Sequence, residues 1–142
     1  MINSLTEALS KFRSEVISTE DTVLWVKANS SSTAQISRTS YLKLKRGNPL
    51  PACVEALPAC NKCSGIFVFG EFTSYSAFEM FDDQLKQSLS KNEIRNISEP
   101  QWQTLLPEVL GGAIFYECCS CGAIWLLVLP ERAQRGSWTR IA

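Results

Sequence analysis

The chain has 142 residues, of which 45% are hydrophobic and 20% charged, and its 14 basic and 14 acidic side chains cancel. This composition excludes an intrinsically disordered chain, and the zero net charge argues against a nucleic-acid binder held mainly by charge. The sequence has no histidine, which removes the commonest general base, the Ser-His and Cys-His nucleophile pairs and every imidazole metal site. We therefore expect a binding protein rather than an enzyme.

The N-terminal part is predicted to begin with a helix. Leu5, Leu9, Phe12 and Val16 recur at spacings of three and four, which places them on one buried helical stripe. Ser4 followed by Glu7 forms a capping-box pattern at its start. Beyond this helix, the short β-prone runs at 23–26 and 41–45 predict strands, with a polar loop or weak hairpin over 28–40 between them.

The remaining elements predict one α+β domain over residues 1–142. We expect strands at 66–69, 113–117, 123–129 and 137–141, the third of them central and buried on both faces. Apolar spacing predicts a helix from about Ser76 to Leu89, and Ser98 with Gln101 is a cap pattern for another. The predicted fold is an antiparallel sheet of five or six strands with about three helices, and a helical insertion at 74–110.

Two C-x-x-C pairs carry the clearest chemical signal, Cys60 with Cys63 and Cys118 with Cys121. Two thiolates three positions apart can hold one metal ion from a tight turn, and two such turns supply the four ligands of a tetrahedral zinc site. The sequence thus predicts zinc-ribbon-like knuckles at 60–65 and 118–122, with a structural Zn²⁺ on all four sulfurs. A site closed by four thiolates stabilises the fold and leaves no position for substrate.

Other interpretations of the cysteines remain open. The pairs are 54 residues apart, and all four could be buried thiols. A thioredoxin-type redox pair fits less well, because it requires a helix N-terminus and both pairs are expected to flank strands. Cys53 and Cys119 are left over as small apolar fillers, although Cys119 could replace Cys118 as a ligand. Neither has a histidine partner, so a cysteine nucleophile is not expected.

Charge is unevenly distributed along the chain. The segment 71–117 contains eight acidic and three basic residues, whereas four basic residues and no acid lie between Arg38 and Arg46. The acidic residues Glu79, Asp82, Asp83 and Glu93 could form a docking face for a basic protein, or simply the solvated face of a helix. The basic segment could hold RNA or DNA, but it lacks the clustered exposed aromatic residues of a stacking platform.

The C-terminal segment resembles the end of small zinc-binding bacterial immunity proteins. In that family a C-x-x-C-G-x-x-W turn and strand precedes a loop with proline and glycine, as Cys118 to Trp125 precedes the loop from Pro130 to Gly136 here. The resemblance is confined to this segment, and C-x-x-C-G turns also occur in unrelated zinc ribbons. It implies a cytosolic protein that binds and neutralises one cognate protein toxin and has no catalytic residues. The acidic insertion would suit a basic nuclease toxin.

The polar, acid-containing N-terminus is unlike a signal peptide, and the longest apolar run is too short to cross a bilayer. We therefore expect a cytoplasmic protein that contacts neither membrane nor nucleic acid. The predicted function is a zinc-stapled immunity protein or other protein-binding module. The alternative is a zinc-ribbon nucleic-acid-binding or transcription-associated factor.

Overall fold

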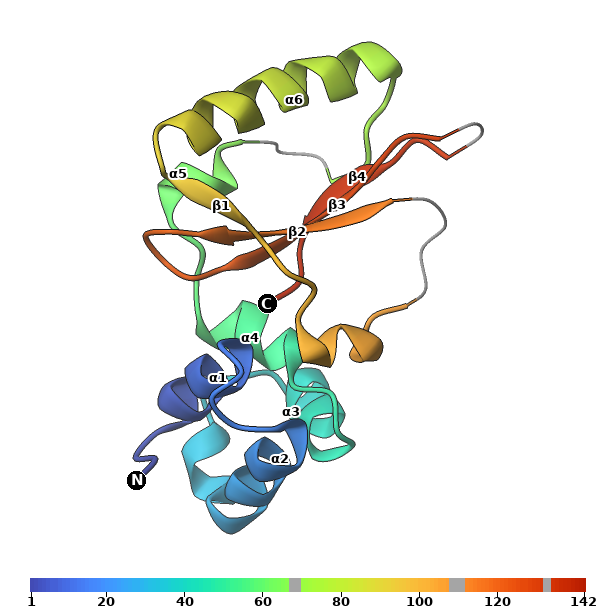
Figure 1. Cartoon of the computed structure of the whole chain (residues 1–142). Coiled ribbons are helices and arrows are strands. Elements are labelled where there is room, and N and C mark those ends of the chain that lie inside the picture. Colours follow the sequence, from blue (N-terminus) through green and yellow to red (C-terminus); the bar gives the residue numbers. More distant parts are fainter. Residues whose placement is uncertain (67–69, 108–111, 132–133) are drawn as a thin grey trace. The chain divides into compact units, whose positions relative to one another are not determined.

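The computed structural model describes residues 1–66, 70–107, 112–131 and 134–142 (Figure 1). Its chain divides into two compact units, the first made of Met1–Pro58, Pro100–Leu106 and Ala142, the second of Ala59–Glu99 and Pro107–Ile141. The described residues form six α-helices, two 3-10 helices and one four-stranded antiparallel sheet. The α+β class is confirmed, while the extent of the predicted domain, 1–142, stays a prediction.

The first unit is helical. Serines at the starts of three helices, Ser4, Ser18 and Ser37, accept backbone N–H groups three residues further on and so satisfy donors that a helix leaves free. The buried side chains include Leu5, Leu9, Phe12, Val26, Leu44 and Cys53. The elements of this unit are α1 (Leu5–Arg13), α2 (Thr19–Ala28), η1 (Ser30–Thr33), α3 (Arg38–Lys45), α4 (Leu50–Ala56) and η2 (Gln101–Leu105).

Both strands predicted in this unit are wrong. Residues 23–26 lie within α2 and residues 41–45 within α3, because serine caps and burial at helical spacing outweigh the β-preference of a few side chains. The expected 28–40 loop contains η1 and the start of α3. Val16 is 68% exposed rather than buried, since α1 ends at Arg13 and Glu15 follows in a left-handed conformation with φ of 65°.

The second unit contains the sheet, with strand order β1-β2-β3-β4 and antiparallel pairing throughout. The strands are β1 (Ile94–Ile97), β2 (Ala113–Cys118), β3 (Ile124–Val128) and β4 (Ser137–Arg140). Helix α6 (Tyr75–Ser90) lies against one face of this sheet (Figure 1). Phe81 and Leu85 of α6 share one apolar cluster with Tyr116, Trp125 and Trp138 of the strands.

Most elements of the second unit were predictable. The helix at 76–89 and the strands at 113–117, 123–129 and 137–141 are confirmed with small shifts of their ends, and every residue of β3 is buried. The described part of the chain has four strands rather than five or six. The predicted 66–69 strand falls largely on residues 67–69, which lie outside the described residues, and the neighbours found for β2 are β1 and β3.

The predicted insertion at 74–110 is only partly helical. It contains α6, but also β1, which pairs with β2 through the register of Ile94 with Cys118. The helix expected after Ser98 is instead the 3-10 turn η2, which begins after Pro100 without a side-chain cap. The segment Pro100–Leu106 belongs to the first unit.

Candidate metal centre

Two segments far apart in the sequence place four cysteines at one end of the sheet. Cys60 is the N-cap residue of α5 (Asn61–Ser64), and Cys63 lies inside this single helical turn. Cys118 is the last residue of β2, and Cys121 lies in the tight turn that leads to β3. Gly122 has a φ of 79°, in the left-handed region that favours glycine, so the turn can reverse directly after Cys121.

The spacing of the four sulfur atoms fits one tetrahedral metal ion. All four Sγ atoms lie within 4.8 Å of one another. Individual pairs are 3.5 Å apart for Cys60 and Cys118, 3.6 Å for Cys63 and Cys121, and 3.9 Å for Cys60 and Cys63. Metal–sulfur bonds of about 2.3 Å in tetrahedral geometry place the sulfurs about 3.8 Å apart. The cysteines are free thiols, and the predicted clustering of these four is confirmed.

Backbone N–H groups of both turns favour the thiolate form of cluster sulfurs, as expected for metal ligands. The N–H of Cys63, with a further contribution from that of Lys62, lowers the pKa of Cys60 to about 6 against the cost of burial. Burial raises the pKa of Cys118, although the N–H groups of Cys121 and Ser120 oppose this rise. Burial also raises the pKa of Cys63. Metal binding removes these thiol protons, so the N–H groups are placed to stabilise the bound form.

The indole of Trp125 lies beside Cys63 of the cluster. Its Nε1 is buried and has no hydrogen-bond partner among the described residues. Its N–H nevertheless lowers the pKa of Cys63, against the larger effect of burial. A neutral thiol is a weak acceptor, whereas a metal-bound thiolate is a strong one. A buried N–H without a hydrogen-bond partner next to this sulfur therefore fits a deprotonated, metal-bound Cys63.

The two remaining cysteines are separate from the cluster. Cys53 is fully buried in α4 of the first unit, as an apolar filler would be. Cys119 is exposed, so the filler prediction is wrong for this residue, and it is Cys118 rather than Cys119 whose sulfur joins the cluster. The N–H of Cys119 donates to the carbonyl of Glu93 at 3.0 Å, which ties the second turn to the residue preceding β1.

The predicted docking residues are not equivalent in the structure. Glu79 and Asp83 are exposed one helical turn apart on α6. Asp82 forms an ion pair with Lys86, with 2.8 Å between Oδ2 and Nζ. Glu93 lies beyond the end of α6, where it is half-buried, so it does not extend the helical stripe.

The predicted basic segment lies on a helix of the first unit. Arg38, Lys43 and Lys45 belong to α3, and Arg46 is its C-cap residue. The Nζ atom of Lys45 lies 5.5 Å from the ring centroid of Tyr41. The ring is therefore already covered by a cation of the same chain.

The sequence argument against a redox pair assumed that both cysteine pairs flank strands, and the strand expected after the first pair falls on residues 67–69, outside the described residues. The first cysteine pair begins the helical turn α5 instead of flanking a described strand. Its position therefore no longer argues against a redox pair. The distances between sulfur atoms argue against a redox pair. Cys60 and Cys63 each lie within 3.6 Å of a sulfur of the other pair, so neither pair forms a separate dithiol. Trp125 was missed as a neighbour of the cluster, although the spacing C-G-x-x-W contained the signal.

Comparisons with known proteins found no matching family model, no similar curated protein and no similar solved structure. Among the described residues, none of the helices has both the length and the apolar character needed to cross a membrane.

Proposed function

We propose that this chain is a non-enzymatic protein-binding module whose second unit is held together by one structural Zn²⁺ ion on Cys60, Cys63, Cys118 and Cys121. The observation that carries the proposal is that the four Sγ atoms lie within 4.8 Å of one another. Four thiolates complete a tetrahedral zinc site and leave no coordination position for water or substrate. The ion would join α5 to the β2–β3 turn and so fix two parts of the unit that lie far apart in sequence.

The surroundings of the cluster support a structural role. Cys63 and Cys118 are 2% and 1% exposed and belong to the same apolar cluster as the core of the second unit. Buried thiols without a metal would contribute little beyond packing, whereas an ion shared by four thiolates couples its binding free energy to folding.

The outer face of α6 is the proposed binding surface. Tyr75 and Met80 are 65% and 68% exposed, and Glu79 and Asp83 lie on the same helix. Aromatic and methionine side chains are enriched in protein interfaces, while carboxylates around them attract a basic partner. The partner that fits this surface is a basic protein. In line with the sequence resemblance, we propose a protein toxin that the chain neutralises by covering it.

The proposal is tested by native mass spectrometry of the untagged protein purified from its own cells. We expect one zinc per chain and a second, basic protein in the same complex. Zinc together with nucleic acid would favour the alternative, in which α3 supplies the basic surface. A metal-free chain would contradict the structural-zinc proposal.

Charge reversal then locates the surface on the identified partner. Asp83→Lys should slow association and reduce its salt dependence, because Asp83 is exposed on α6. Asp82→Lys is a weaker test, since it also breaks the ion pair with Lys86. Glu99→Lys makes the same charge change at an exposed residue away from the helix, so it is the control. Equal effects of Asp83→Lys and Glu99→Lys would move the interface away from α6.

A further inference from the structure

The four cysteines of the proposed zinc site differ in their exposure to solvent. Cys63 and Cys118 are only 2% and 1% exposed, whereas Cys60 and Cys121 are half-buried. Each C-x-x-C pair therefore contains one cysteine enclosed by the apolar core of the second unit and one at the margin of this core. A small oxidant that reaches the centre from solvent meets Cys60 or Cys121 first, because oxidation of thiolates follows their exposure.

Two close approaches between sulfur atoms join the pairs crosswise. The Sγ atoms of Cys60 and Cys118 are 3.5 Å apart, and those of Cys63 and Cys121 are 3.6 Å apart. Within the first pair, the Sγ atoms of Cys60 and Cys63 are further apart, at 3.9 Å. Each crosswise approach sets a half-buried cysteine of one segment against a buried cysteine of the other. The enclosed sulfur is therefore placed to react with an oxidised neighbour.

Contacts other than the metal hold the two segments that carry the cysteines. In the β2–β3 turn, the N–H of Gly122 donates to the carbonyl oxygen of Cys118 at 3.0 Å. In α5, the N–H of Ser64 donates to the carbonyl oxygen of Cys60 at 3.2 Å. Cys63 and Cys118 also belong to one apolar cluster. The sulfur atoms of the two segments should consequently stay close to one another while the ion leaves.

We propose that hydrogen peroxide converts this centre into two disulfides that join the pairs crosswise, Cys60 to Cys118 and Cys63 to Cys121, with release of the zinc ion. The inference rests on the proposed zinc site and adds its response to oxidation. Oxidation within each pair would instead link Cys60 to Cys63 and Cys118 to Cys121, which is the pairing of dithiol redox motifs.

The reaction balances with one peroxide for each disulfide. The sulfur of Cys60 attacks a peroxide oxygen, the O–O bond breaks, hydroxide leaves and a sulfenic acid forms. The sulfur of Cys118 then attacks the oxidised sulfur, which forms the S–S bond and expels a second hydroxide. Two thiolates have lost two electrons, and the two hydroxides take up two protons to become water. A second peroxide oxidises Cys121 and Cys63 in the same way, and zinc leaves as Zn²⁺ without a change of oxidation state.

Crosswise disulfides would preserve the connection that the ion provides between α5 and the β2–β3 turn. Each joins residues 58 positions apart, whereas a bond within the first pair joins residues only three positions apart. A disulfide stabilises a fold by removing loop-closure entropy from the unfolded chain, and this effect grows with the length of the loop. The oxidised chain should therefore lose its metal and keep its second unit folded.

The test is oxidation of the full zinc-bound chain with a small excess of hydrogen peroxide. Zinc release is followed with a chromophoric chelator, remaining thiols are blocked with N-ethylmaleimide, and tryptic peptides are mapped by mass spectrometry without reduction. We expect zinc to be released as the disulfides form. The oxidised, zinc-free chain should melt at least about 16 °C above the reduced, zinc-free chain. Equal melting of these two forms would overturn the proposal.

Trypsin distinguishes the possible pairings because it cuts after Lys62. The first cysteine pair is thereby divided between the peptides 47–62 and 63–86, while the second pair shares the peptide 96–132. Crosswise disulfides link all three peptides in one product, and fragmentation of this product assigns each bond. Disulfides within the pairs link only the first two peptides and would overturn the proposal, as would the opposite crosswise assignment.

Cys119→Ser is the matched control. Cys119 is exposed, lies between the cysteines of the second pair and is outside the cluster. The variant should release zinc and give the same linked product as the unaltered chain. A disulfide to Cys119 in the unaltered chain, or a different pairing in the variant, would show that this exposed thiol reacts in place of a half-buried ligand and would overturn the proposal.

The zinc proposal and the oxidation proposal fail in different ways. A chain purified without zinc contradicts the structural-zinc proposal before any oxidant is added, and the disulfide map of that chain still decides the crosswise pairing. Zinc that stays bound in excess peroxide, or that leaves with disulfides formed within the pairs, overturns the oxidation proposal and retains the zinc site.

Discussion

Replacement of Cys121 by serine removes one sulfur of the proposed zinc site and leaves the turn before β3 otherwise similar. A ligand present at a thousand times its dissociation constant stabilises a fold by about 4 kcal/mol. In a unit of fewer than 100 residues, each 1 kcal/mol corresponds to roughly 4–8 °C in Tm. If Cys121→Ser abolishes zinc binding, the Tm of the second unit should fall by at least about 16 °C.

The assay is thermal unfolding followed by near-ultraviolet circular dichroism. Trp125 and Trp138 are stacked with centroids 5.2 Å apart and 6° between their planes, so their signal reports the second unit. Cys119→Ser makes the same chemical change two residues earlier, at an exposed sulfur outside the cluster, and should melt like the unaltered chain. The metal hypothesis is refuted if both serine variants melt alike and a chelator leaves the unaltered chain unchanged.

Three further predictions concern other parts of the molecule. Trp125→Phe removes the N–H beside the cluster and should weaken zinc binding about tenfold in competition with a chromophoric chelator, whereas Trp138→Phe, in the same stacked pair, should not. The Glu55 carboxylate accepts hydrogen bonds from serine side chains and a backbone N–H at the start of α3, which lower its pKa from 4.5. Its stabilising effect is therefore complete above this value and is lost as pH falls through the lowered folded-state pKa. Glu55→Gln should consequently be less stable at neutral pH, by urea unfolding, and approach the unaltered chain in acid; a constant difference would contradict this. Gly136→Ala should destabilise the second unit by about 2 kcal/mol or more in urea, because φ is 77° and the new Cβ would lie 2.4 Å from a backbone carbonyl oxygen; an unchanged midpoint would contradict the β3–β4 geometry.

The elements that could be predicted are those whose signal is local. The helix at 5–13 has a cap and an apolar stripe, and β3 is a continuous apolar run between a glycine and a proline. The four cysteines of the cluster could be identified for the same reason, because metal chemistry prescribes their spacing within each pair.

The elements that were predicted wrongly or missed have two physical causes. The first is that residues 23–26 and 41–45 are short apolar runs, for which periodicity cannot separate a strand from a helix. The caps that mark them as helices, Ser18 and Ser37, were overlooked. Strand β1 has polar residues at its centre and forms through pairing with β2, where Arg95 Nε donates to Glu117 Oε1 at 2.8 Å. That pairing joins residues 22 positions apart, which a local pattern does not contain.

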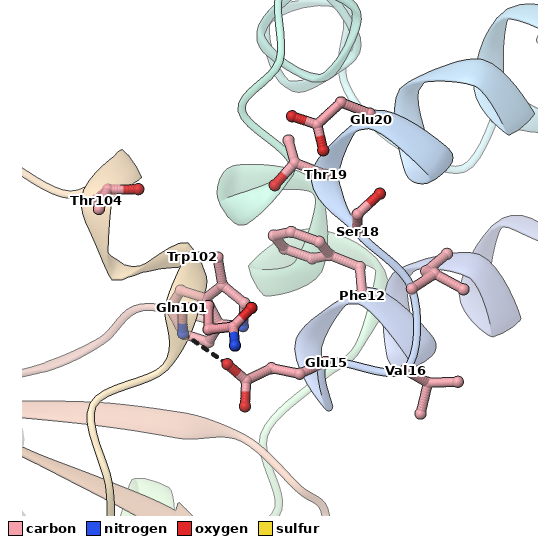
Figure 2. Close-up of a pocket in the computed structure, with 10 residues that line it drawn as sticks. Phe12, Glu15, Val16, Ser18, Thr19, Glu20, Gln101, Trp102 and Thr104 are labelled. Carbon is pink, nitrogen blue, oxygen red and sulfur yellow. Dashed lines mark hydrogen bonds between the residues drawn. The ribbon is translucent and has the colours of Figure 1, made fainter.

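The pocket lined by Phe12, Glu15, Gln101 and Trp102 (Figure 2) could not be predicted, because it brings together residues far apart in the sequence. Glu15 and Gln101 are 86 positions apart, and the pocket exists only because η2 returns to the first unit. The nearest local signal was the aromatic side chain of Trp102, which the structure places in the core and beside the pocket.

The central claim is that four thiolates close one zinc site, and X-ray absorption at the zinc edge tests it most directly. The protein is purified without added metal, and the number and distance of the ligand atoms are measured. We expect four sulfur atoms at about 2.3 Å and no nitrogen or oxygen neighbour. A shell with fewer than four sulfurs, or with a bound water oxygen, would contradict the closed site and reopen the case for chemistry at the metal.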